Sequence, residues 1–188
     1  TIGNSTNTGT VVLGSTSNSF TNGLTVKYGT ASIGAQSNIV STNTITLSNG
    51  GTLLGNAAAV TVSNAINLST GGGTIAEVNA GTLTLSGVIS GSTGLTIGNS
   101  TNTGTVTFAE GTSNSNTYAG TTTVAYGTLA LGNAGGATAY GTLLGSGAVT
   151  VNAITLDSTA LNPGATVTAL AGLTQLDVDN VSVNTNTI

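Results

Sequence analysis

The chain has 188 residues, of which 29 are glycine and one is proline, and only 3% of its residues are charged. It contains no histidine or cysteine, and Lys27 is its single cation, so the formal charge is −4. The usual general base, thiolate nucleophile and guanidinium clamp are therefore missing, which argues against an enzyme or a bound cofactor. One cation also excludes a surface that follows nucleic-acid phosphates.

Short alternating segments are the main predicted elements, because the composition disfavours helices. Glycine costs about 1 kcal/mol relative to alanine inside a helix, and Thr, Asn, Ser and Val are poor helix formers. Apolar residues instead alternate with Thr or Ser, a pattern typical of strands that bury one face. In chain order these predicted strands are Thr44–Leu47, Thr74–Val78, Thr82–Leu85, Thr105–Phe108 and Val149–Leu156. No apolar run approaches the ~20 residues that span a bilayer, so we expect no membrane-spanning segment.

An eleven-residue word, TIGNSTNTGTV, occurs at Thr1–Val11 and again unchanged at Thr96–Val106. Further segments match between the two halves, including Ser17–Gly34 with Ser115–Gly132. Repetition of this kind is typical of solenoids. We therefore predict one continuous solenoid of two repeat units, with the ranges 1–95 and 96–188, whose last coils at 160–188 are atypical.

The predicted fold is all-β, a parallel β-helix or β-solenoid. At roughly 20 residues per coil, near the low end of solenoid periods, the chain makes about nine coils, and a spacing of about 4.8 Å gives a rod roughly 45 Å long. Equivalent residues of successive turns are expected to stack, with Val, Leu, Ile and Ala inside and ladders of Thr and Asn outside. Local periodicity alone also fits an antiparallel sandwich or barrel.

One segment resembles a known family. NTYAGTTTVAYGTLALG at Asn116–Gly132, with a partial second instance at Asn79–Gly87 and a looser one at Asn18–Gly34, resembles the autotransporter-associated β-strand repeat. The resemblance implies a right-handed β-helical passenger displayed on a bacterial cell surface, with a role in adhesion, aggregation or surface coating. It brings no catalytic residues.

Few residues are candidates for chemistry. Asp177 and Asp179, at i and i+2 of a predicted strand, would project from one face about 7 Å apart. Such a pair suits a Ca²⁺ ion or, in principle, a glycosidase, whereas the simpler interpretation is a charged edge strand that discourages unwanted pairing. Tyr28 and Tyr126 occupy equivalent positions, so they are either a binding stripe or, as we expect, aromatic packing against the core. Lys27 is interpreted as a solvated lysine.

The two ends of the chain are candidates for self-association. Thr1 begins inside the repeat word without a recognisable cap, and Asn180–Ile188 is another alternating stretch. A solenoid without caps exposes unpaired backbone at its terminal coils. We therefore expect head-to-tail stacking into a fibre through Thr1, Ile2, Val181, Val183 and Ile188, unless the chain is a segment of a longer passenger.

These features favour an extracellular structural or adhesive solenoid whose partners are copies of itself and a host or matrix surface. An ice-binding solenoid is one alternative, because hydroxyls of Thr-x-Thr pairs can form an array on a flat face. The pairs concerned are Thr44/Thr46, Thr82/Thr84, Thr105/Thr107 and Thr166/Thr168. Their irregular spacing argues against this alternative. A polysaccharide-active β-helix is a third possibility, weakened by the missing Arg and His.

Overall fold

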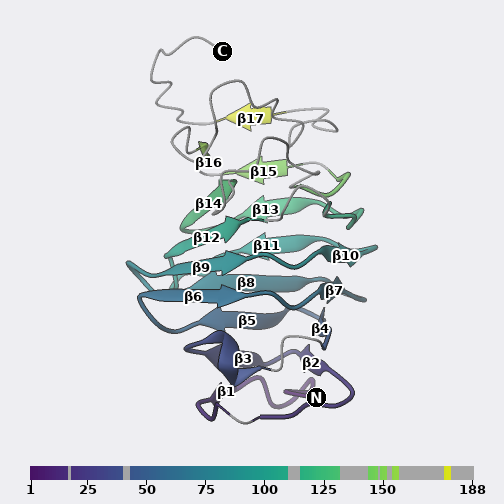
Figure 1. Ribbon diagram of the computed structural model, residues 1–188. Coiled ribbons are helices and arrows are strands. Elements are labelled where there is room, and N and C mark those ends of the chain that lie inside the picture. The colour runs from purple at the N-terminus through teal and green to yellow at the C-terminus, as the bar shows by residue number, and fades with distance from the viewer. Residues whose placement is uncertain are drawn as a thin grey trace.

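The protein is an all-β parallel solenoid with strands stacked along one axis (Figure 1). The computed structural model describes residues 1–16, 18–39, 43–109, 115–131 and 144–147, and the backbone of strands 149–151, 154–156 and 176–178. Within this described part, every pairing between named strands is parallel, and the one helical element is the 3₁₀ turn η1 (Gln36–Asn38). The predicted parallel solenoid is therefore confirmed, and the antiparallel alternative is wrong.

Three parallel sheets form the sides of the solenoid. The eight-stranded sheet contains β1 (Thr10–Leu13), β3 (Thr30–Ile33), β5 (Gly51–Gly55), β8 (Gly73–Glu77), β11 (Leu95–Ile97), β13 (Thr122–Val124), β15 (Val149–Val151) and β17 (Leu176–Val178). The four-stranded sheet contains β2 (Leu24–Lys27), β4 (Ile45–Ser48), β7 (Ile66–Leu68) and β10 (Ile89–Gly91). The five-stranded sheet contains β6 (Ala59–Val62), β9 (Thr82–Leu85), β12 (Thr105–Phe108), β14 (Thr128–Leu131) and β16 (Ile154–Leu156). In the middle of the chain each coil visits the four-stranded, eight-stranded and five-stranded sheets in that order.

The length of a coil changes along the chain. In the eight-stranded sheet, Thr52 of β5 pairs with Thr74, whereas Thr96 of β11 pairs with Thr123, which is a longer step along the sequence. In the five-stranded sheet, Thr105 lies midway in sequence between its two partners, Thr82 and Thr128, so the step from β9 to β12 equals the step from β12 to β14. All of these steps are longer than the roughly 20 residues expected of a low-period solenoid.

The two copies of the repeated word lie in different sheets. Ile2 pairs with Val26 of the four-stranded sheet, whereas Ile97, its equivalent, lies in β11 of the eight-stranded sheet. The offset between the two copies is not a whole number of coils, so the second copy falls on the next face. Equivalent residues of the two copies of this word therefore lie on different faces of the solenoid.

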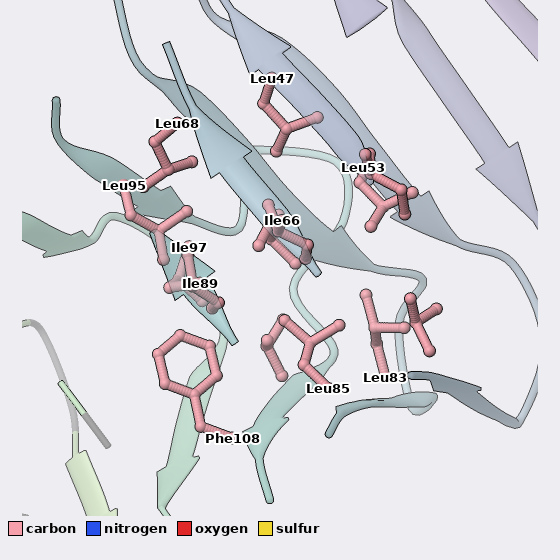
Figure 2. Close-up of a cluster of buried hydrophobic side chains, with 14 of the residues drawn as sticks. Leu47, Leu53, Ile66, Leu68, Leu83, Leu85, Ile89, Leu95, Ile97 and Phe108 are labelled. Atoms are coloured by element: carbon pink, nitrogen blue, oxygen red, sulfur yellow. The ribbon is translucent and has the colours of Figure 1, made fainter. Parts of the chain in front are cut away.

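The core is a column of apolar side chains that follows from the period-two pattern. Leu53, Ile75 and Ile97 pair in succession and are fully buried, and Leu83 and Val106 do the same in the five-stranded sheet. Figure 2 shows residues of all three sheets converging on the same interior, with Phe108 among them. Burying each such side chain contributes about 1.5–3 kcal/mol, so repetition of the coil is the source of stability.

Asparagine side chains join successive coils at the corner that leads into the four-stranded sheet. Asn116 Oδ1 accepts a hydrogen bond of 2.6 Å from the Ile89 backbone N–H. Asn64 Nδ2 donates to the backbone carbonyl of Asn43 at 2.6 Å, and Asn43 Nδ2 in turn donates to the Phe20 carbonyl. The amide side chains thus take the place of ladder hydrogen bonds where the chain bends.

Candidate interaction surfaces

The outer face of the five-stranded sheet carries two columns of threonine, which we call the threonine array. One column contains Thr82, Thr105 and Thr128, and the other contains Thr61, Thr84 and Thr107. Strand geometry spaces the side chains by about 4.8 Å along each column and about 7 Å across it. Thr61 is exposed and the other five are half-buried. The array therefore presents hydroxyl and methyl groups at regular intervals, without a charged side chain among its members.

The sequence identified only part of this array. Thr82/Thr84 and Thr105/Thr107 stack in register as the Thr-x-Thr pattern requires. Thr46, in contrast, belongs to β4 of the four-stranded sheet, and Thr166 and Thr168 lie outside the described residues. The Thr-x-Thr pairs look irregularly spaced along the sequence, but the threonines of β9, β12 and β14 lie in register within this sheet.

A longer single column of threonine runs along the outside of the eight-stranded sheet. It consists of Thr10, Thr30, Thr52, Thr74, Thr96, Thr123 and Thr150. Asp177 of β17 follows Thr150 in register. The side chain of Asp177 and the whole of Asp179 lie outside the described residues, so the calcium hypothesis for this pair stays a prediction.

A groove of about 470 Å³ lies at the corner between the four-stranded and eight-stranded sheets. Its lining is glycine, threonine, serine and one leucine, and includes Gly71–Gly73, Ser92–Leu95 and Gly120–Thr121. Glycoside hydrolysis requires two carboxyl groups that flank the bond, and none of the described residues that line this groove carries one. The described lining of this groove therefore lacks the carboxyl pair that the polysaccharide-active alternative requires.

The two equivalent tyrosines do not pack in the core. Tyr126 is 48% exposed, and Tyr28 is half-buried with Lys27 Nζ 5.6 Å from its ring centroid. Tyr28 lies two residues after the inward-facing Val26, and Tyr126 lies two residues after the inward-facing Val124. If the strands β2 and β13 continued to these positions, the tyrosine side chains would also point inward. The chain turns instead: Tyr28 adopts a φ of 67° and leaves the strand. Our expectation of core packing is wrong for Tyr126, and because the two residues lie at different corners they form no stripe.

Among the tyrosines that the structure describes, Tyr118 is the one that lies in the core. It is fully buried, and its hydroxyl lies 2.6 Å from Thr122 Oγ1, which is also buried. Both residues belong to the segment that resembles the autotransporter-associated repeat. In this segment, Asn116 bonds to the preceding coil and Tyr118 fills the interior, so its distinctive residues serve the packing of the solenoid.

The first strand, β1, carries exposed apolar side chains. Val11 and Val12 of β1 are 45% and 65% exposed, although Val11 pairs with the fully buried Ala31 and occupies an inward position. Ile2 is partly protected, because it exchanges two backbone hydrogen bonds of 2.7 Å with Thr25 and Lys27. Thr1 is exposed. The sequence pointed to Thr1 and Ile2, whereas β1 carries the larger exposed apolar surface; Val181, Val183 and Ile188 lie outside the described residues.

Comparison of the chain with family models, with curated proteins and with solved structures finds no match. Among the residues that the structure describes, no helix is long and apolar enough to cross a membrane. The same residues contain no group of three or more His, Cys, Asp or Glu side chains arranged to hold a metal ion.

Proposed function

We propose that this chain is a structural or adhesive segment of an extracellular, bacterial surface solenoid that associates with copies of itself through its ends. The exposed apolar surface of β1 carries the proposal. The strand β1 pairs with β3 on one side, and its inward Val11 is 45% exposed although its in-register neighbour is buried. An additional parallel coil over this end would continue the sheet and cover the valines.

The finer form of the proposal is a right-handed solenoid of about nine coils built from the two sequence repeats. The eight strands of the longest sheet support a coil number of this order. The resemblance of Asn116–Gly132 to the autotransporter-associated repeat supports the bacterial surface location and the passenger role. The low charge and the threonine columns support a scaffold, because like residues stacked on neighbouring strands stabilise a sheet without ion pairs.

Sedimentation velocity of the purified 188-residue chain over a range of concentrations tests the association. We expect a concentration-dependent series of end-to-end oligomers, seen as filaments by electron microscopy. Val12→Lys places a charge on the open edge and is expected to shift the chain to monomer, because charged edge strands resist pairing. Thr84→Lys, which adds the same charge to the threonine array on β9, a strand paired on both sides, is the control and is expected to leave association unchanged.

A chain that stays monomeric at all concentrations contradicts end-to-end association. Equal effects of Val12→Lys and Thr84→Lys would also contradict it, because association would then depend on net charge or on a lateral face.

The threonine array supports ice binding as a second candidate function. The observation that favours it is the register in which Thr82/Thr84 lie directly next to Thr105/Thr107, which creates a two-dimensional pattern of hydroxyl and methyl groups. Such a surface can hold water in a repeating arrangement through hydroxyl hydrogen bonds, with the methyl groups filling the space between them.

Thermal hysteresis and ice recrystallisation assays test this second candidate. We expect activity that Thr105→Tyr abolishes, because a large side chain at the centre of the array prevents close contact with a flat lattice. Thr74→Tyr, in the outer column of the eight-stranded sheet, is the matched control. Absence of activity in the wild-type chain, or equal loss in both variants, would contradict ice binding.

A further inference from the structure

Glu77 occupies a position in the core that its neighbours fill with apolar residues. It pairs with Gly55 of β5, which pairs with Ile33, which pairs with Leu13, so the four residues form one inward column of the eight-stranded sheet. Leu13 and Ile33 are buried, and Glu77 is 0% exposed. Because side chains of a strand alternate between its two faces, Glu77 lies on the same inward face as Ile75. The strand pattern of the sequence therefore indicates that Glu77 is buried.

Glycines on three sides make room for this carboxyl group. A Cβ at Gly55, on the preceding coil, would overlap Glu77 Oε2. A Cβ at Gly81 would lie 2.6 Å from Oε1, and one at Gly104, on the following coil, would lie 2.9 Å from the Glu77 Cγ. Main chain therefore encloses the carboxyl group on three sides: Gly55 on the preceding coil, Gly104 on the following coil and Gly81 beside it.

The surroundings of the carboxyl supply few partners and no opposite charge. Oε1 accepts a hydrogen bond of 2.9 Å from the Val78 N–H, whereas Oε2 has no hydrogen-bond partner. The strands packed around this corner, which are β5, β6, β9, β11 and β12, contain no titratable side chain. A buried carboxylate without a cation is strongly disfavoured, and such a group takes up a proton instead.

We propose that Glu77 is a neutral carboxylic acid in the folded solenoid over a pH range in which it is ionised in the unfolded chain, so that the central coils are held most firmly in acid. The direction of the pKa agrees with the geometry. Burial raises the pKa of Glu77 above its ordinary 4.5, and the amides of Val78 and Ala57 offset part of that rise. Folding then takes up one proton between the two pKa values.

The sign of the pH effect follows from this proton. Below the ordinary pKa both states are protonated, and the stability is complete. As the pH rises toward the raised pKa of the folded state, the unfolded chain loses its proton first and becomes favoured. The equilibrium constant for unfolding is expected to rise about tenfold per pH unit in this window, because a single proton is linked to folding.

Denaturant unfolding of the chain between pH 4 and pH 8, followed by circular dichroism, tests the proposal. We expect the wild-type chain to lose stability as the pH rises, and Glu77→Gln, which keeps the shape without the charge, to remove this loss. Glu110→Gln removes one Glu carboxyl elsewhere and is the control, expected to keep the wild-type slope. Equal pH profiles of the wild type and Glu77→Gln would overturn the proposal.

A second measurement does not depend on the folding of a Glu77 variant. The chain has two glutamates, Glu77 and Glu110, so labelling Glu carboxyl groups with ¹³C gives two signals, and Glu110→Gln assigns them. We expect the Glu77 carbon to keep the chemical shift of a protonated acid above pH 4.5. Titration of Glu77 within the ordinary range of exposed glutamates would overturn the proposal.

Discussion

Close contact between successive coils decides which residues the corners accept. At Gly51, a Cβ would overlap the backbone carbonyl of Val26 on the preceding coil, and neither partner is a flexible side chain that can move away. At Gly14, by comparison, nothing lies within 4 Å of the Cβ position. The close approach of two coils therefore requires glycine at position 51 and not at position 14, although the sequence alone does not distinguish the two residues.

We predict that Gly51→Ala lowers the free energy of unfolding by about 1–3 kcal/mol, the usual cost of inserting a methyl group into a packed region. Gly14→Ala is expected to change it by about 0.5 kcal/mol or less, as surface substitutions usually do. Denaturant unfolding of both variants measures the difference. A Gly51→Ala chain as stable as Gly14→Ala would contradict the close approach of these coils.

Some individual strands were predictable, because they depend on local sequence, whereas the predicted segment Val149–Leu156 is two strands, β15 and β16, in different sheets. The alternating segments at Thr82–Leu85 and Thr105–Phe108 coincide with β9 and β12 residue for residue. The repeated word also folds locally in the same way twice, since Asn4 and Asn99 each accept hydrogen bonds from the residues two and three positions later. The bends at Tyr28 and Tyr126 were not predictable, because the strand pattern does not show where the chain turns out of the sheet.

The two identical turns differ in their surroundings, so the same substitution in each turn is expected to change the free energy of unfolding by different amounts. The turn at Asn99 connects β11 and β12, and each of these strands is paired on both sides. The turn at Asn4 leads into β1, which pairs only with β3 among the named strands. We predict that Asn99→Ala costs about 1 kcal/mol of unfolding free energy, the usual value for a lost capping side chain.

Asn4→Ala is expected to cost less than half as much, because a segment at an open end unfolds locally before the rest of the chain. Chemical denaturation of the two single variants provides the comparison. Equal costs would show that both turns belong to one cooperative unit and would contradict the expectation for β1, which among the named strands pairs only with β3.

The arrangement of strands in the whole molecule depends on the number of residues in each coil. The sequence did not reveal this number. Parallel stacking followed from the repeats, and the structure confirms it. The face on which each copy lies did not follow, because insertions lengthen some coils: the step from Thr96 to Thr123 is longer than the step from Thr52 to Thr74. Only part of the threonine array was identified, because its pairs look irregularly spaced along the sequence, and the burial of Glu77 was overlooked although the strand period indicated it.

Disulfide formation between cysteine pairs on β9 and β12 tests the parallel stacking most directly, because the chain has no natural cysteine. In the parallel register, Thr82 lies opposite Thr105, and Thr84 lies opposite Thr107. We predict that Cys at either of these pairs oxidises to an intramolecular disulfide, since directly opposed residues lie within bonding reach. The exchanged pairs Thr82/Thr107 and Thr84/Thr105 are expected to stay reduced, because diagonal neighbours lie about 7–8 Å apart. Disulfides in the exchanged pairs, and none in the directly opposed ones, would show antiparallel strands and contradict the solenoid.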